Sequence, residues 1–398
     1  MSHYDYLIVG GGMAADAAVR GIREVDPTGA IGLLGAEADP PYKRPPLSKA
    51  LWRGKPLDRV WLDTAAQDVD LHLGRTAARL DLAHRVVVDD RDAGYTFGKL
   101  LLATGGAPRR LPFGGDRIIA FRTLADYRRL AALAVEGQRF AVIGGGFIGG
   151  EIAAALAMHG KAVTLVFPEA GIGARLFPPD LARFLNGYYQ ERGVEVLAGA
   201  AAVGLDERGE RLALRTREFA SDAEREIVVD GVVAGIGIAP NVELARGAGL
   251  AVDDGIVVDA MLRTSHPDVY AAGDVAECFS PALGGRRRVE HEDNATTMGR
   301  AAGRAMAGDS RPYEHLPFFY SDLFDLGYEA VGDVDARLET VADWAEPHRQ
   351  GVVYYLADGR VRGVLLWNVW DRVDAARALI AAPGAVRPDE LPGRIPAA

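Results

Sequence analysis

Cysteine is nearly absent from this chain, whose 398 residues include only Cys278. A single thiol cannot form a disulfide within the chain, and no group of Cys and His residues has the spacing of a metal site. We therefore expect no bound metal. Cys278 lies late in the chain, directly after Gly273–Glu277, and we favour a small buried residue there over a reactive thiol.

Long apolar runs and an excess of positive charge are also absent. No stretch reaches the roughly 18 apolar residues of a membrane span, so none is expected. The net charge of −10 argues against nonspecific binding to nucleic acid, which depends on cationic contacts with phosphate. Residues Met1–Tyr6 lead straight into an apolar strand and leave no room for a signal peptide, which predicts a cytoplasmic protein.

The chain does contain one fingerprint twice, in Tyr6–Ala15 and Phe140–Gly149. Each copy is a short apolar strand, a G-x-G-x-x-G/A turn and the start of an Ala-rich helix. The first Gly makes the bend, the second lets the backbone approach a pyrophosphate, and the third position must be small. The helix N-terminus offers N–H groups to the phosphates. Glu37 and Glu169 each follow the next strand, at the spacing of a carboxylate that accepts ribose hydroxyls.

Two dinucleotide sites in one chain indicate a flavoprotein that moves electrons from a nicotinamide to FAD. Because the chain has no cysteine pair, these electrons must leave the flavin directly rather than through a protein dithiol.

The length predicts two or three domains. We expect an α/β fold with two Rossmann-like dinucleotide-binding domains, of the glutathione-reductase type, and a C-terminal α+β domain. Residues 1–112 and 238–312 form the predicted FAD-binding domain. Residues 113–237 form the NAD-binding domain, and residues 313–398 form the C-terminal domain.

Within the C-terminal domain, Gly351–Leu356 and Val361–Trp370 flank an Asp-Gly pair, which predicts a hairpin with a tight turn. A helix is expected over about 372–380. The Pro- and Gly-containing segment 383–398 is expected to be a loosely held tail.

Four further segments carry a family resemblance: Pro41–Lys49, Leu283–His291, Gly327–Gly332 and Leu365–Asn368. With the two fingerprints in this order, the chain resembles the FAD-dependent pyridine nucleotide oxidoreductases of the ferredoxin reductase type. It looks most like apoptosis-inducing factor and its bacterial relatives. It departs from that family in three ways. The insertion in the last domain is reduced to the short loop 345–350, an acid used in dimerisation is replaced by Ala251, and a tryptophan near the flavin is replaced by Tyr320.

The resemblance implies contacts with both cofactors. Those with FAD are at Gly10, Gly12, Met13, Ala14, Glu37, Arg44, Lys49, Ala77, Arg122, Asp274, His291 and Tyr320. Those with NAD are at Gly145, Gly146, Phe147, Ile148, Glu169, Arg175, Gly237, Glu290, Glu329 and Asn368.

Four positions are implied to act in catalysis, three of them among these contacts and the fourth Glu151. Lys49 sits beside the flavin N5 and pairs with Glu151, Phe147 is an aromatic gate for the nicotinamide, and His291 lies at the flavin ring. The alternatives are that Lys49 is an ordinary surface charge and that Phe147 is a core residue. The triple arginine at 286–288 is expected to be a solvated, charged turn rather than a partner patch.

These observations predict an FAD-dependent NADH oxidoreductase that passes hydride from NADH to FAD and then electrons to an acceptor. The acceptor is either a small redox protein, ferredoxin or rubredoxin, or a small molecule. The alternative is a redox-sensing protein with a long-lived reduced flavin–NAD complex. Glu169 favours NADH over NADPH, and Arg175 softens that preference. The last domain either closes over the nicotinamide or serves as a dimerisation module, so both a monomer and a homodimer stay open.

Overall fold

The computed structural model describes residues 1–309 and 311–397. The chain forms two compact units, each assembled from three segments. Unit 1 comprises residues 1–44, 57–107 and 239–318. Unit 2 comprises residues 45–56, 108–238 and 319–398. The two units do not test the predicted division into three domains, which stays a prediction.

Unit 1 is built on a seven-stranded sheet in which β1 (Ser2–Val9) is central. β1 runs parallel to β2 (Ile31–Gly35) on one side and to β6 (Gly94–Leu102) on the other, and β18 (Val269–Ala271) adds in parallel to β6. Because both faces of these strands are covered, they consist of continuous apolar runs. The remaining strands of this sheet are β3 (Asp70–Leu73), β4 (Ala77–Asp81) and β5 (Val86–Asp89).

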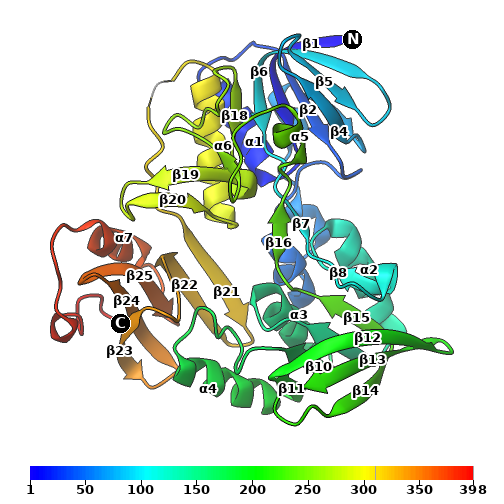
Figure 1. Cartoon of the computed structure of the whole chain (residues 1–398), viewed down its shortest axis with the longest axis vertical. Coiled ribbons are helices and arrows are strands. Elements are labelled where there is room, and N and C mark those ends of the chain that lie inside the picture. Colours follow the sequence, from blue (N-terminus) through cyan, green and yellow to red (C-terminus); the bar gives the residue numbers. More distant parts are fainter. Residues whose placement is uncertain (310, 398) are drawn as a thin grey trace. The chain divides into compact units, whose positions relative to one another are not determined.

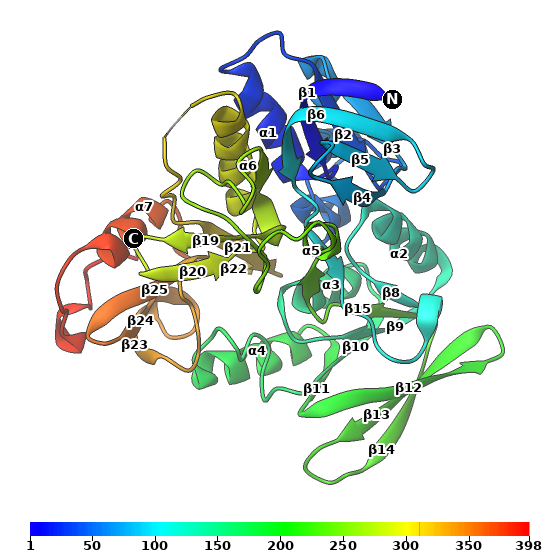
Figure 2. The same cartoon turned by 45° about the horizontal axis from the view of Figure 1, so that its top comes forward.

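Helix α1 (Met13–Arg23) packs along α6 (Glu292–Met306), and the two lie side by side in both Figure 1 and Figure 2. A Cβ atom at Gly299 would lie 2.3 Å from the carbonyl oxygen of Ala14, and one at Gly303 would lie 2.0 Å from that of Ala18. The helix backbones therefore approach more closely than any larger residue allows. This unit also holds the short helix α5 (Glu243–Gly247) and a small sheet of β17 (Ile256–Val257), β19 (Ala276–Ser280) and β20 (Gly285–Arg288).

Unit 2 contains a second parallel sheet of five strands, in the order β11-β10-β9-β15-β8. Its central strand β9 (Arg139–Ile143) leads into helix α3 (Phe147–Met158), which is buried over most of its length. The other elements of this layer are β8 (Ile118–Ala120), α2 (Leu124–Glu136), β10 (Ala162–Phe167), α4 (Pro179–Gln190), β11 (Val194–Ala198) and β15 (Gly231–Ala234).

An antiparallel sheet of three strands extends beyond the parallel sheet in Figure 2. Its strands are β12 (Ala200–Arg208), β13 (Arg211–Glu218) and β14 (Glu224–Val229). Two short strands, β7 (Gly106–Pro108) and β16 (Ile238–Pro240), form a separate two-stranded sheet.

The rest of unit 2 is a five-stranded sheet with the order β21-β22-β25-β24-β23 and one helix, α7 (Val373–Ala381). The predicted hairpin is confirmed: β24 and β25 pair antiparallel, and Asp358 and Gly359 between them have φ angles of 52° and 69°. Positive φ at both central residues is the geometry of the tight turn that an Asp-Gly pair favours. The strands are β21 (Phe318–Leu323), β22 (Leu326–Gly332), β23 (Glu339–Glu346), β24 (Gln350–Ala357) and β25 (Arg360–Trp367).

Two predictions about local structure are wrong. The segment 383–397 is not a loose tail, since Leu391 and Ile395 are buried and the backbone N–H of Ile395 donates to the hydroxyl of Tyr354 at 3.1 Å. The arginine triple is not a turn either, because it lies on strand β20. Arg286 is exposed there, whereas the side chain of Arg288 is 10% exposed and binds Asp254 and Glu290. Tyr354 and Asp254 lie more than thirty residues from the segments that they contact, and a local pattern does not reveal such partners.

No helix in the described parts of the chain is both long enough and apolar enough to cross a membrane.

A polar cluster in unit 1 predicts how stability depends on pH. The His72 imidazole and the Tyr4 hydroxyl share a hydrogen bond of 2.8 Å. Burial lowers the pKa of His72, and this effect outweighs the negative charge of Asp70, which raises it. The unfolded chain therefore binds a proton more readily than the folded one, so this contribution to stability is present above pH 6.5 and is lost as the pH falls below it.

We expect the free energy of unfolding of the wild type to fall more steeply below pH 6.5 than that of His72→Gln, which cannot titrate there. Urea unfolding at a series of pH values measures both slopes. Parallel curves would show that His72 does not couple folding to protonation.

Candidate active site

In the first fingerprint turn, one glycine is required by the packing of the backbone and another leaves room for a ligand. Gly10 ends β1 with a φ of 127°, and a Cβ atom there would lie 2.0 Å from the carbonyl oxygen of Ala103. Gly12 is different, because its backbone is extended and a Cβ atom would meet only the Arg44 guanidinium, at 4.0 Å. The protein itself therefore requires glycine at Gly10 and leaves open space at Gly12.

The second fingerprint turn also has glycines that the backbone packing requires and one glycine beside open space. Gly144 has a φ of 114°, and a Cβ atom there would lie 2.4 Å from the carbonyl oxygen of Gly235. A Cβ at Gly149 would lie 1.8 Å from the carbonyl oxygen of Gly144. A Cβ at Gly146 would have no described atom within 4 Å.

Gly12 and Gly146 are also the N-caps of α1 and α3, and neither helix has a side-chain cap in the described structure. Space beside an uncapped helix N-terminus suits a pyrophosphate, which accepts from backbone N–H groups and interacts favourably with the helix dipole. Both turns therefore fit a dinucleotide. The predicted contact residues at the start of these helices are Met13 and Ala14 in α1 and Phe147 and Ile148 in α3. Gly145 lies in the glycine turn of the second fingerprint, before α3.

The two acids behind the turns are each held by an arginine. Glu37 follows β2, and its Oε1 accepts from Arg44 at 2.6 Å while its Oε2 accepts from the Tyr42 hydroxyl at 2.6 Å. Glu169 follows β10, and its Oε1 accepts from Arg175 at 2.7 Å. The side chain of Arg175 is 84% exposed, so part of the charge of Glu169 is balanced by a mobile, solvent-facing cation.

Unit 2 brings together the predicted catalytic lysine and acid. Lys49 and Glu151 form an ion pair with 2.7 Å between Nζ and Oε1, and their side chains are 12% and 2% exposed. The Nζ atom also lies 5.2 Å from the centre of the Tyr320 ring. One turn earlier on α3, Phe147 packs edge-on against Phe319 with 5.5 Å between ring centres. The ion pair excludes the alternative that Lys49 is a solvated surface charge.

Two serines at this ion pair were missed in the sequence. Ser48 Oγ donates to Glu151 Oε2 at 2.5 Å, and Ser321 Oγ donates to Glu151 Oε1 at 2.5 Å. Each serine is adjacent in sequence to a predicted site residue, Lys49 or Tyr320, and that adjacency was the one available signal. Nothing local indicates that both hydroxyls turn toward the same carboxylate.

In the C-terminal sheet, the predicted residue Glu329 has a carboxylate oxygen without a hydrogen-bond partner among the described residues, whereas both side-chain polar atoms of Asn368 are hydrogen-bonded. Glu329, on β22, has a buried Oε2 with no hydrogen-bond partner among the described residues, and burial, with the charge of Asp371, raises its pKa. Asn368 has a φ of 49°; its Oδ1 accepts from the Gly327 N–H at 2.7 Å and its Nδ2 donates to the Arg349 carbonyl at 2.9 Å. Glu329 is therefore available to a ligand donor, whereas Asn368 already holds two strand ends together.

The remaining predicted residues are distributed over both units. In unit 1, Asp274 follows Gly273, whose φ of 77° and close approach to Ala14 place this turn at the start of α1. Also in unit 1, His291 is the N-cap of α6 and Glu290 accepts from Arg288 at 2.5 Å. The others occupy strand ends and turns: Ala77 begins β4 in unit 1, whereas Arg122 precedes α2 and Gly237 follows β15 in unit 2.

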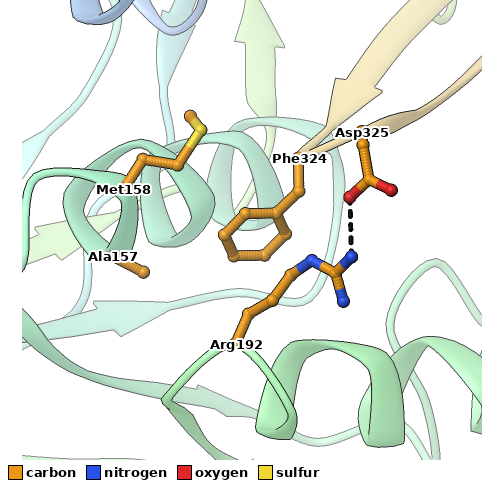
Figure 3. Close-up of a pocket in the computed structure, with 5 residues that line it drawn as sticks. All are labelled: Ala157, Met158, Arg192, Phe324 and Asp325. Atoms are coloured by element: carbon orange, nitrogen blue, oxygen red, sulfur yellow. Dashed lines mark hydrogen bonds and ion pairs between the residues drawn. The ribbon is translucent and has the colours of Figure 1, made fainter.

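Neither the thiol nor a pocket at the C-terminus of α3 is lined by the predicted site residues. Cys278 is 5% exposed, and burial raises its pKa to about 11, which confirms the small buried residue that was favoured. A pocket of about 430 Å³ lies in unit 2 at the C-terminus of α3 (Figure 3). Arg192 and Asp325 form an ion pair in its wall, with 2.7 Å between Nη2 and Oδ1.

The two fingerprint turns, with their acids, define a flavoprotein class, and comparison with known proteins identifies the family. The family model described as pyridine nucleotide-disulphide oxidoreductase matches residues 4–299. A model of the C-terminal region of mitochondrion-associated apoptosis-inducing factor matches residues 302–350 and 345–382. The chain belongs to the pyridine nucleotide-disulphide oxidoreductase family, and it is an FAD-dependent oxidoreductase that uses NAD(H), as predicted.

The chain is similar to ferredoxin reductase components over nearly its whole length. It is 35% identical to the ferredoxin reductase subunit of the 5,5'-dehydrodivanillate O-demethylase of Sphingobium sp., covering 98% of this chain and 96% of that protein. It is 36% identical to the ferredoxin–NAD(+) reductase component of the anthranilate 1,2-dioxygenase system of Burkholderia cepacia, covering 98% and 97%.

The crystal structure of the covalent putidaredoxin reductase–putidaredoxin complex superposes with a TM-score of 0.89 at 29% identity, covering 98% of this chain and 95% of that chain. The predicted fold class is confirmed by this similarity.

Because the space at Gly12 and at Gly146 is open, we expect a larger residue at either position to prevent the binding of one cofactor without affecting the other. Gly12→Val is expected to fold, because its backbone conformation is open to any residue, but to purify without flavin. Gly146→Val is expected to keep its FAD and to lose NADH binding by at least about tenfold, as one steric clash with the pyrophosphate costs more than about 1.4 kcal/mol. Absorbance of the bound flavin and NADH titration measure the two effects. A yellow Gly12→Val protein with full occupancy would move FAD away from the first turn.

The Glu169–Arg175 pair predicts how the two donors are distinguished. The carboxylate repels a 2′-phosphate, while Arg175 attracts it. We expect Glu169→Ala to narrow the preference for NADH over NADPH and Arg175→Ala to widen it. Steady-state kcat/KM with both donors measures the ratio. If neither variant changes the ratio, this pair does not contact the ribose.

Proposed function

We propose that this chain is an NADH-dependent reductase that delivers electrons to a small iron–sulfur protein of the ferredoxin type. The observation that carries the proposal is the state of the single cysteine. Cys278 is buried and its pKa is raised to about 11, so it forms neither a dithiol nor a reactive thiolate. Electrons therefore have to leave the flavin directly, as in a ferredoxin reductase. Two relatives similar over nearly the full chain are named as such reductases, which supports this acceptor.

The roles of the site residues are part of this proposal. In the first dinucleotide site, the space at Gly12 receives the pyrophosphate of FAD, Glu37 accepts from the ribose, and Arg44 and Asp274 lie beside the phosphates. The remaining FAD contacts are Gly10, Met13, Ala14, Lys49, Ala77, Arg122, His291 and Tyr320. We also keep the division into an FAD-binding domain (1–112 and 238–312), an NAD-binding domain (113–237) and a C-terminal domain (313–398).

In the second site, the space at Gly146 receives the pyrophosphate of NADH, and Glu169 accepts from its ribose. The buried, unpaired oxygen of Glu329 suits a donor such as a carboxamide N–H, because a buried acceptor without a partner costs free energy. Phe147 and Tyr328, with ring centres 6.3 Å apart, provide an apolar wall next to the ion pair. The remaining NAD contacts are Gly145, Ile148, Arg175, Gly237, Glu290 and Asn368.

Bound FAD supplies the redox chemistry by accepting a hydride from NADH and passing its electrons on. The chain contributes position and charge. A cation at Lys49 Nζ, held by Glu151, stabilises negative charge that develops nearby, and in a site with little water that stabilisation is large. A cytoplasmic location is part of the same proposal, since the donor NADH is plentiful there.

One observation favours a second function. Residues 302–350 and 345–382 match the C-terminal model of apoptosis-inducing factor, and this match supports a redox-sensing role as the alternative. A redox-sensing role would require a reduced flavin–NAD complex that persists in air. A small-molecule acceptor is the other outcome that the test below distinguishes.

Anaerobic reduction with NADH, followed by rapid mixing with an acceptor, tests the proposal. We expect reoxidation by a [2Fe–2S] ferredoxin to be at least about 100-fold faster than reoxidation by oxygen or a quinone, because a complementary docking surface speeds encounter with a protein partner by about that factor. Rubredoxin and buffer without acceptor are the controls. A long-wavelength band that persists with every acceptor would instead support the sensing role, and fast reaction with the quinone alone would support a small-molecule reductase.

A further inference from the structure

The carboxylate of Glu151 is almost completely enclosed, since the residue is 3% exposed. Three donors reach its two oxygens: Lys49 Nζ and Ser321 Oγ at Oε1, at 2.7 and 2.5 Å, and Ser48 Oγ at Oε2, at 2.5 Å. The donors come from two separate segments of unit 2, residues 45–56 and 319–398, and Glu151 lies in the third, so only the tertiary fold brings these four residues together.

All three contacts favour the ionised form of Glu151. A buried charge is tolerated only where it is paired and hydrogen-bonded, and an ionised carboxylate accepts at both oxygens. Ser48 has a second acceptor in the Pro45 carbonyl, but at 3.5 Å that contact is at the limit of a hydrogen bond. The single hydroxyl hydrogen of Ser48 therefore belongs to Glu151.

The other groups that face this carboxylate do not replace the serines. Tyr189, on α4, gives its hydroxyl to the Gly150 carbonyl at 3.1 Å. Tyr328, on β22, is the other neighbouring tyrosine. Burial and then the charge of Glu151 raise the pKa of both tyrosines, so both stay neutral beside it. Lys49 is the one cation among the described groups that contact Glu151.

We propose that Ser48 and Ser321 are positioning residues that hold Glu151 ionised and aimed at Lys49, and so keep Lys49 a fixed cation. The inference rests on the proposed role of Lys49 beside the flavin, but its core statement concerns the charge of Glu151. Without one hydroxyl, a carboxylate oxygen loses a donor inside the protein and the acid takes up a proton more readily. Lys49 then lacks its counter-charge.

Infrared spectroscopy of the oxidised holoprotein tests the charge of Glu151 directly. The band of its protonated carboxyl is identified by its loss in Glu151→Gln. In Ser48→Ala and in Ser321→Ala we expect this band to appear at higher pH than in the wild type, equivalent to an increase of about 10- to 100-fold in proton affinity. Ser48→Thr retains a hydroxyl and is expected to behave as the wild type. The two alanine variants are independent, so failure of one to fold leaves the other.

Thr164→Val is the matched control, because the Thr164 hydroxyl also donates to a glutamate in unit 2, Glu195, at 2.8 Å. It should leave the Glu151 band unchanged. A purely structural role of the serines would change the melting temperature or FAD content without moving the band. An unmoved band in both alanine variants overturns the inference, and so does an equal movement in Thr164→Val.

The flavin midpoint potential separates this inference from the proposed function. When Glu151 is neutral, no negative charge offsets the charge of Lys49. We therefore expect a more positive flavin potential in the alanine variants at pH values where the band of the protonated Glu151 carboxyl is present. Adding Glu151→Gln to either variant should abolish the pH dependence of that shift. If Lys49→Ala leaves the potential and the rate of reduction by NADH unchanged, the proposed role of Lys49 fails, while the infrared result still decides the role of the serines.

Discussion

In both units, a glycine at the end of the first fingerprint strand lets two stretches of backbone pass at a distance that excludes any side chain. Gly10 approaches the carbonyl of Ala103, and Gly144 approaches that of Gly235. These contacts set the direction in which α1 and α3 leave their sheets. The open space at Gly12 and Gly146, where we propose that the two pyrophosphates bind, lies at the start of these helices.

Unit 2 encloses an acid that an apolar interior accepts only when donors surround it. Glu151 lies on a helix that is buried over most of its length, and Lys49 and two serines reach its two oxygens there. The single cysteine is buried, so under the proposed function this ion pair, rather than a dithiol, would tune the flavin.

The C-terminal sheet shows how fold and function share residues. Asn368 ties the Gly327 and Arg349 backbones together, so its amide stabilises the sheet. Glu329, on the neighbouring strand β22, has a buried oxygen with no hydrogen-bond partner among the described residues. The same sheet contributes Tyr320 and Ser321 at the ion pair. Packing of the last residues against it, through Leu391 and Ile395, makes the chain's final segment part of this structure.

The sequence by itself determined the features that depend on local chemistry. The two glycine turns, the apolar parallel strands, the Asp-Gly hairpin and the lack of a thiol pair each follow from residue types at short spacing, and with them the fold class and both cofactors. The pairing of Lys49 with Glu151 also followed, but only through family resemblance. Only the tertiary structure decided which groups surround that pair, because Ser48, Glu151 and Ser321 lie in three distant segments of the chain. It also decided that the arginine triple lies on a strand and that the final segment is packed, since burial of both depends on partners that no local pattern specifies.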